Sequence, residues 1–463
     1  MSQQPSRGFG PVLTNPHFRS LWMAQLLCQT SQHAIHFVQL MLIEQLTGSA
    51  MHIGFTILAF SLPGVIFSPV AGVVVDRFPK KYVLVASNLA RVVLAASYVP
   101  VLATLDGTWE LLAIYTLTFL TATLAQFFSP AEAATIPLLV GEERLYAANS
   151  LFSLTMVVSQ AVGLLILGPL VVSLARVQGG FLIISAMYLA AAILVSTLPL
   201  DKPHSGAAAA TIGWREVWIE FKEGLQFVSG QPRLQAAMVH LVTITTLVMV
   251  MAMLAPGYSA RVLGMAPQNA VIVFAPAGVG MLAATLVAGR WGHVMRRLRF
   301  GYVGLFLVGL LFAALGLLSM DYQRLLQPIL DVYPGAAFSL TSGTMVIALL
   351  LGLCMSTVNI LAQTVLQRES PAHLRGRVFS VQFMLNNLVG IPPLLALGIM
   401  ADAVGIPPAL IIAGLITIGM AVISLLLRRR ATPGFQMMPE PSMAAQDSPE
   451  RTDGPHRFDS EIP

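Results

Sequence analysis

Long runs of apolar residues, separated by short polar segments, repeat along almost the whole chain. A run of roughly 20 apolar residues crosses about 30 Å of hydrocarbon as a helix. Helices are expected because every backbone polar group must find a partner inside lipid, and stretches such as 242–254 lack the alternation of a membrane β-strand. We predict twelve spans, at 18–43, 52–75, 82–104, 110–130, 147–174, 178–199, 234–256, 268–289, 301–319, 341–366, 377–400 and 407–427.

A polar stretch at 201–232 divides these spans into two sets of six. The predicted regions are a cytoplasmic N-terminal segment (1–17), a first six-helix half (18–200), a linker (201–232), a second half (233–430) and a disordered tail (431–463). The linker is expected to hold an amphipathic helix on the cytoplasmic membrane surface, either a plain connector or a regulatory element. One side of that helix would carry Trp214, Trp218, Phe221, Leu225 and Val228.

Composition supports a membrane protein. Charged residues make up 10% of the 463 residues, hydrophobic residues make up 56%, and the mean hydropathy is +0.77. About a quarter of a soluble domain is charged, so these few charges could not cover a water-soluble fold. No small-residue cleavage site follows the first apolar run, and no signal peptide is expected. Cys28 and Cys354 both fall in apolar segments, which gives no indication of a disulfide.

Basic residues predict the orientation. With the N-terminus in the cytoplasm, 23 of the 26 Lys and Arg residues lie on or near that side, Arg91 among them. Only Arg176, Arg261 and Arg324 remain outside. This positive-inside bias would vanish if a span had been missed or invented, so both termini are expected to be cytoplasmic. Because the excess charge lies in loops, nucleic-acid binding is not expected.

The two halves resemble each other in sequence. Ala71-Gly72 followed by Asp76, Lys80 and Lys81 corresponds to Ala288-Gly289 followed by His293, Arg296 and Arg297. Such a duplication favours a carrier, because alternating access is largely one half rocking against the other around a central site. The expected fold is therefore all-α, with two six-helix halves around a central cavity.

The segment Ala71-Gly-Val-Val-Val-Asp76-Arg77-Phe-Pro-Lys80-Lys81 resembles the signature loop between helices 2 and 3 of the major facilitator superfamily. Further segments are similar to its branch of enterobactin exporters and macrolide-efflux proteins, namely Leu46-Thr-Gly-Ser-Ala50, Pro130-Ala131 with Asn149, Glu223-Gly-Leu-Gln-Phe227 and Arg375-Gly-Arg-Val-Phe-Ser380. The resemblance covers roughly residues 14–430. It implies a proton-driven secondary transporter, usually an exporter, in a bacterial cytoplasmic membrane.

The same resemblance implies a conformational latch. A carboxylate at Asp76 is unfavourable at the end of its own helix unless another partner receives it, and the family suggests the N-terminus of helix 11. The latch residues would be Gly72, Asp76, Arg77, Lys80, Lys81, Arg375, Gly376 and Arg377. The alternative is that these charges only fix the topology. His293 takes the acidic position in the second half, so one full latch is expected.

Two polar stripes predict a substrate path. Five side chains of the first helix fall within about 80° of arc at 100° per residue, and four of the tenth helix fall in a similarly narrow arc. Lipid exposure would be costly for so many hydrogen-bonding groups, so they line a solute path or bond neighbouring helices together. The residues are Gln25, Gln29, Gln32, His36, Gln39, Ser356, Asn359, Gln363 and Gln367.

Proton coupling has three candidates: His33, His36 and Glu132. The family resemblance implies an acid about where this chain has Gln32, and this departure weakens a simple carboxylate relay on the first helix. Histidine titrates near neutral pH, although a histidine inside a membrane also serves as a structural hydrogen-bonding group. Glu132 follows Pro130 and could pair with Arg375 or Arg377, whereas Glu44 and Asp402 are read as interfacial charges near the outer ends.

These observations favour a monomeric exporter of a small amphipathic solute, siderophore or drug-like, that works with protons in the lipid bilayer. Import or lipid flipping by the same fold, and a non-transporting scaffold, are the alternatives. An enzyme is not expected, since the sequence shows no metal-ligand cluster, phosphate loop or nucleophile elbow. No metal or cofactor is expected.

Overall fold

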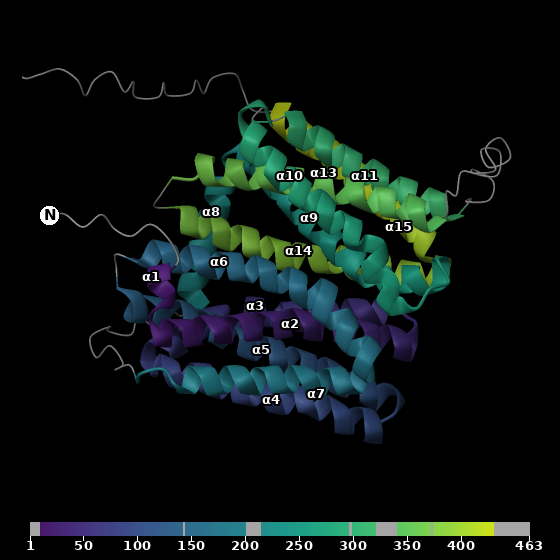
Figure 1. Cartoon of the computed structure of the whole chain (residues 1–463). Coiled ribbons are helices and arrows are strands. Elements are labelled where there is room, and N and C mark those ends of the chain that lie inside the picture. Colours follow the sequence, from purple (N-terminus) through teal and green to yellow (C-terminus); the bar gives the residue numbers. More distant parts are fainter. Residues whose placement is uncertain are drawn as a thin grey trace, which may run out of the picture.

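The computed structural model describes residues 10–141, 144–200, 214–295, 299–320, 340–371 and 374–429, and the described part is built of helices (Figure 1). Predictions on the tail 431–463 and on Arg324 lie outside these residues. The first half contains α1 (Gly10–Leu13), α2 (Pro16–Thr47), α3 (Ala50–Arg77), α4 (Lys80–Thr104), α5 (Gly107–Val140), α6 (Leu145–Ala161), η2 (Val162–Leu167) and α7 (Gly168–Ser196).

Helix α8 (Trp214–Ser229) follows. The second half contains α9 (Pro232–Gly257), η3 (Tyr258–Val262), η4 (Pro267–Asn269), α10 (Ala270–Met295), α11 (Arg299–Met320), α13 (Leu340–Glu369), α14 (Arg375–Val404) and α15 (Ile406–Arg429). We call the end where α2 begins and α8 lies the linker end, on the left of Figure 1, and the opposite end the distal end.

The twelve predicted spans are confirmed by the described residues. Ten segments are long and apolar enough to cross a membrane. One of these, Leu154–Ser196, joins two predicted spans, and Arg176, at φ 57°, breaks the helical path between them. Helix α2 completes the set; it is not among the ten, and its stripe of Gln and His residues gives it a polar composition.

Local sequence explains where the helices begin. The Asn15 side chain accepts hydrogen bonds from the amides of His17 and Phe18 at the start of α2, as an N-cap residue should. Its own Nδ2 donates to the carbonyl of Leu139, 2.7 Å away, near the end of α5. Gly48, at φ 58°, ends α2, and Ser49 caps α3 immediately afterwards. The turn between these helices is therefore very short.

The predicted end of the fourth span, at 130, is wrong by ten residues, because α5 continues to Val140 with Pro130 and Pro137 inside it. Proline is tolerated in membrane helices when neighbouring helices and local adjustments satisfy the freed backbone groups. Glu132 consequently lies within a helix rather than at its end.

Helix α8 packs against the linker end of the second half. Val228 is buried there in one apolar cluster with residues of α9, α13 and α14, including Leu234, Leu366 and Val378. Leu225, predicted to share the apolar side, is exposed. The side chains of Trp214, Trp218 and Phe221 lie outside the described ones.

Candidate functional site

The polar stripe of α2 is bonded to helices of its own half. Gln25 donates to the carbonyl of Phe152 (3.5 Å) and Gln39 donates to the hydroxyl of Tyr98 (2.8 Å), and both glutamines are buried. Nε2 of Gln32 and Nε2 of His36 are 2.8 Å apart. The His36 ring stacks on that of Phe60, with centroids 4.2 Å apart. Gln29 and His33 are partly buried.

The stripe of α13 is more open. Ser356 is buried and donates to the carbonyl of Met281 in α10, at 3.3 Å. Gln363 is partly buried, whereas Asn359 and Gln367 are exposed. The hydrogen bonds of Gln25, Gln39 and Ser356 all stay within their own halves, so a solute path along the two stripes remains a prediction.

The structure does not describe the side-chain positions of most predicted latch residues. These are Gly72, Asp76, Arg375, Gly376 and Arg377. The backbone places Arg375 at the start of α14, and only Phe78 and Pro79 separate α3 from α4. Arg77 is exposed and Lys80 is buried. The pairing of Asp76 therefore stays a prediction, as does that of Glu132 with Arg375 or Arg377.

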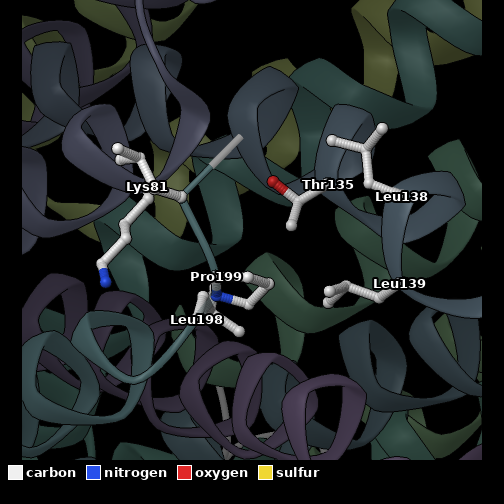
Figure 2. A pocket seen from close by; sticks show the side chains of 7 residues that line it. Lys81, Thr135, Leu138, Leu139, Leu198 and Pro199 are labelled. Carbon is white, nitrogen blue, oxygen red and sulfur yellow. The ribbon is translucent and has the colours of Figure 1, made fainter. Parts of the chain in front are cut away.

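Lys81 lines a small cavity at the linker end of the first half (Figure 2). The cavity has a volume of about 250 Å³ and lies between the start of α4, the end of α5 and the segment after α7. Its other lining residues are Thr135, Leu138, Leu139, Leu198, Pro199 and Leu200. The wall is mostly apolar, and it contains none of the stripe residues.

Sequence reasoning missed a buried charged cluster in the first half. Arg91 of α4, counted above as a charge on or near the cytoplasmic side, is instead 2% exposed inside the bundle. Its guanidinium carbon lies 5.2 Å from the ring centroid of Phe128 and 5.5 Å from that of Tyr188. Glu132 of α5 is 3% exposed and lies one helical turn after Phe128, whose ring contacts Arg91. A charge in the interior of an apolar run was the available signal.

A second charged group connects the halves at the distal end. Asp402, at the end of α14, accepts hydrogen bonds from the amides of Ala50 (2.8 Å) and Met51 (3.0 Å) and from the Ser49 hydroxyl. Arg261 of η3 lies 3.7 Å from both Glu44 and Asp402. An acid at a helix N-terminus is favourable because the first amides there lack helical partners. We call Glu44, Ser49, Arg261 and Asp402 the distal lock.

Small residues allow the halves to approach closely beside this lock. A Cβ on Gly398 of α14 would lie 3.1 Å from the Cα of Met51, and one on Gly54 of α3 would lie 3.2 Å from Leu395. Glycine lets helix backbones come together inside a membrane. The structure is therefore closed between α3 and α14 at the distal end.

Comparison with known proteins gives consistent matches. The family model described as Major Facilitator Superfamily matches residues 21–393. The chain is 25% identical over 417 residues to the uncharacterized MFS-type transporter YfiS of Bacillus subtilis, covering 87% of this chain and 90% of that protein. It is 23% identical over 415 residues to macrolide efflux protein A of Streptococcus pyogenes, covering 88% and 94%.

Solved structures agree on the fold. The nucleoside transporter NupG superposes with a TM-score of 0.65 at 13% identity, over 89% of this chain and 99% of its own. A bacterial homolog of the human lysosomal transporter Spinster, solved in an inward-facing and unoccupied conformation, gives a TM-score of 0.62 at 14% identity, over 89% and 96%. At such identities the likeness concerns the fold alone.

Proposed function

Because this chain belongs to the Major Facilitator Superfamily, we propose that it exports a small amphipathic solute, siderophore or drug-like, by proton-driven alternating access. The distal lock is the observation that carries the proposal. Hydrogen bonds and one ion pair, Arg261 with Glu44, join the two halves there, and a carrier needs a contact of this kind that can form and break as the halves rock.

The proposed orientation puts the distal end outside a bacterial cytoplasmic membrane and both termini in the cytoplasm. Arg176 and Arg261, two of the three basic residues expected outside, lie at the distal end. In this orientation the structure is closed to the outside. Reporter tags on the two termini test it, and tags that report opposite compartments would contradict it.

The solute class is supported by the relatives named as macrolide efflux proteins. Everted membrane vesicles with an acidic lumen provide the test, with radiolabelled erythromycin and a catecholate siderophore as probes. We expect uptake of at least one probe, and collapse of that uptake on adding a protonophore. Lack of transport for both probes would contradict the proposal, and solute leaving the acidic lumen would indicate the importer.

The coupling proposal includes His33, His36 and Glu132 as proton carriers. Two of them are in contact with each other, since the rings of His33 and His36 meet edge to face at 6.4 Å between centroids. The pH profile of erythromycin uptake by His36→Ala is the measurement. A profile identical to that of the wild type would remove His36 from the scheme.

The latch is proposed to hold the outward-open state, with Asp76 received by the start of α14. Asp76→Asn should reduce export several-fold while leaving the amount of protein in the membrane unchanged. Asp106→Asn is a matched control, because Asp106 is exposed and makes no side-chain cap at the start of α5. Normal export by Asp76→Asn would show that the charges only fix topology.

A monomer is proposed as the functional unit, with protons, solute and lipid as its partners and no nucleic acid. Two complete halves in one chain supply both sides of an alternating-access carrier. Single-molecule photobleaching of the labelled protein in vesicles is the measurement. Predominant two-step bleaching would contradict the monomer.

A further inference from the structure

Arg91 is a permanent positive charge deep inside the first half. It lies eleven residues after Lys80, the first residue of α4, which is about 16 Å along a helix axis. Arginine does not lose its proton in proteins. The ring faces of Phe128 and Tyr188 make cation–π contacts with its guanidinium group. Such contacts strengthen when water is absent.

Glu132 is the acidic partner of this charge. It comes from α5, one helical turn after Phe128, whose ring centroid lies 5.2 Å from the guanidinium carbon of Arg91, and its side chain is 3% exposed. Oε1 of Glu132 and Nε of Arg91 are both buried and make no hydrogen bond. Removing two charges from water is costly unless their remaining polar atoms are also hydrogen-bonded. The hydrogen bonding of this pair is thus incomplete.

The other helices bring no second carboxylate to the pair among the described residues. Cys28 of α2 is buried, and its Sγ donates to Oδ1 of Asn88 in α4 at 3.1 Å. From α7 comes Tyr188, whose hydroxyl points to Gln32. Glu132 is therefore the group in this cluster whose charge changes most readily, since Arg91 is fixed.

We propose that Arg91 and Glu132 form a buried proton-binding site, in which Glu132 takes up and releases the proton and Arg91 is its fixed counter-ion. The open Oε1 atom receives the proton. Protonation removes one negative charge from the cluster and leaves Arg91 held by the two aromatic rings. The site then has two states that differ by one charge, as a coupling site requires.

Contacts lead from this site to the distal lock. The Tyr188 hydroxyl donates to Oε1 of Gln32 at 3.3 Å, and Gln32 contacts His36, which stacks on Phe60 of α3. The first amides of α3 are those bound by Asp402 from the second half. A charge change at Arg91 and Glu132 is therefore connected, through three side chains, to the helix that closes the distal end.

Infrared difference spectroscopy of the full-length protein in lipid tests proton binding without a substrate. Protonated carboxyl groups absorb at a different infrared frequency from ionised ones, so a pH titration follows their protonation directly. We expect a band in the wild type that disappears in Glu132→Gln and persists in the control Glu44→Gln. A titration that Glu132→Gln leaves unchanged would overturn the proposal.

Arg91 has its own readout in the same experiment. A nearby positive charge favours the ionised acid by one to three pH units, so Arg91→Gln should move the midpoint of the Glu132 band upward by about one unit or more. Arg91→Lys keeps a positive charge and should return the midpoint most of the way to its wild-type value. An unmoved midpoint in Arg91→Gln would overturn the counter-ion role, and the double variant Arg91→Gln with Glu132→Gln checks that charge loss leaves the protein folded.

The coupling role rests on the proposed function, whereas proton binding does not. If neither probe is transported but the Glu132 band titrates as expected, the proposed function fails and the site stands. If erythromycin uptake is proton-driven and Glu132→Gln retains both the uptake and its pH profile, the function stands and the coupling role is overturned. If Glu132→Gln still binds erythromycin but its uptake no longer depends on pH, the result supports both the proposed function and the coupling role.

Discussion

The two halves differ in what their interiors contain, although both use glycine for close helix contacts, as Gly163 of η2 does against the backbone of Thr30 in α2. In the first half, α2, α4, α5 and α7 meet around the charged pair Arg91 and Glu132. In the second half, helix pairs approach through glycine: Gly352 of α13 faces the backbone of Ala277 in α10, and Gly414 of α15 faces Gly309 in α11. Close packing is an effective way to hold helices in lipid, where the hydrophobic effect between helices is absent.

This difference separates the tasks of the halves. A buried charge pair can respond to a proton, at some cost in stability. A backbone contact between helices offers no such group, and we expect helices joined in this way to move as a rigid unit. The second half does contain a buried histidine, His240, whose Nε2 lies 3.0 Å from the Ser424 hydroxyl, but among the described residues no charged group interacts with it.

The largest effect is expected from breaking the glycine contact. In Gly352→Val the new side chain would collide with the backbone of Ala277, which cannot move aside as a flexible side chain would. Because the clash is with backbone, we expect a loss well beyond the roughly 1 to 3 kcal/mol typical of an overpacked core, large enough to prevent folding and seen as loss of monodisperse protein in detergent. Gly419→Val in α15 is the matched control, because nothing lies within 4 Å of its Cβ position. Equal yields of both variants would contradict rigid packing.

The next effect concerns the charged pair. Arg91→Leu leaves Glu132 buried without its partner, and breaking a buried pair in this way costs about 3 to 5 kcal/mol. The double variant Arg91→Leu with Glu132→Leu should recover most of that loss, because no lone charge remains. Melting temperatures in detergent measure both. A double variant no more stable than Arg91→Leu would show that the pair is not coupled.

A smaller effect is expected at the distal lock, where the two halves meet. Asp402→Asn keeps the shape but removes the charge that binds Arg261 and the start of α3. We expect the population open at the distal end to rise about tenfold, or roughly 1.4 kcal/mol, just below the range of about 1.5 to 3 kcal/mol for hydrogen bonds to charged groups. Spin labels at Thr104 and Val404, both exposed near the distal end, report the distance.

The control for this measurement is Asp106→Asn, which makes the same change at the same end. Asp106 is exposed and forms no cap at α5. Its distance distribution should match that of the unmodified protein. An Asp402→Asn distribution equal to that of the control would mean that the lock does not hold the distal end closed.

Sequence alone predicted the fold well, because apolar length sets the spans and charge sets the loops. The polar first helix was also predicted, because the segments before and after it were assigned to opposite sides of the membrane. Local rules failed at Pro130, because proline is tolerated inside a membrane helix when its surroundings satisfy the freed backbone groups.

The sites were harder to predict because their partners are distant in the sequence. Arg91 was assigned to the loop side, since counting charges cannot distinguish a loop from a bundle interior. The lock joins Asp402 to Ala50, residues separated by 352 positions, and no spacing rule relates them. Asp76 and its expected partners at the start of α14 stay a family-based prediction.

The smallest effect tests whether the halves differ in anything besides charge and glycine. Each half contains one buried tyrosine with two hydroxyl contacts: Tyr98 with Gln39 and Thr118 at 2.8 and 2.9 Å, and Tyr258 with Ser319 and Thr344 at 2.7 and 3.0 Å. Hydrogen bonds between membrane helices contribute about 0.6 kcal/mol each. Tyr98→Phe and Tyr258→Phe should therefore each lose about 1 kcal/mol in thermal unfolding. A much larger loss for Tyr98→Phe would mean that the charged pair of the first half depends on its neutral network, whereas equal losses would leave the buried charges as the difference between the two interiors.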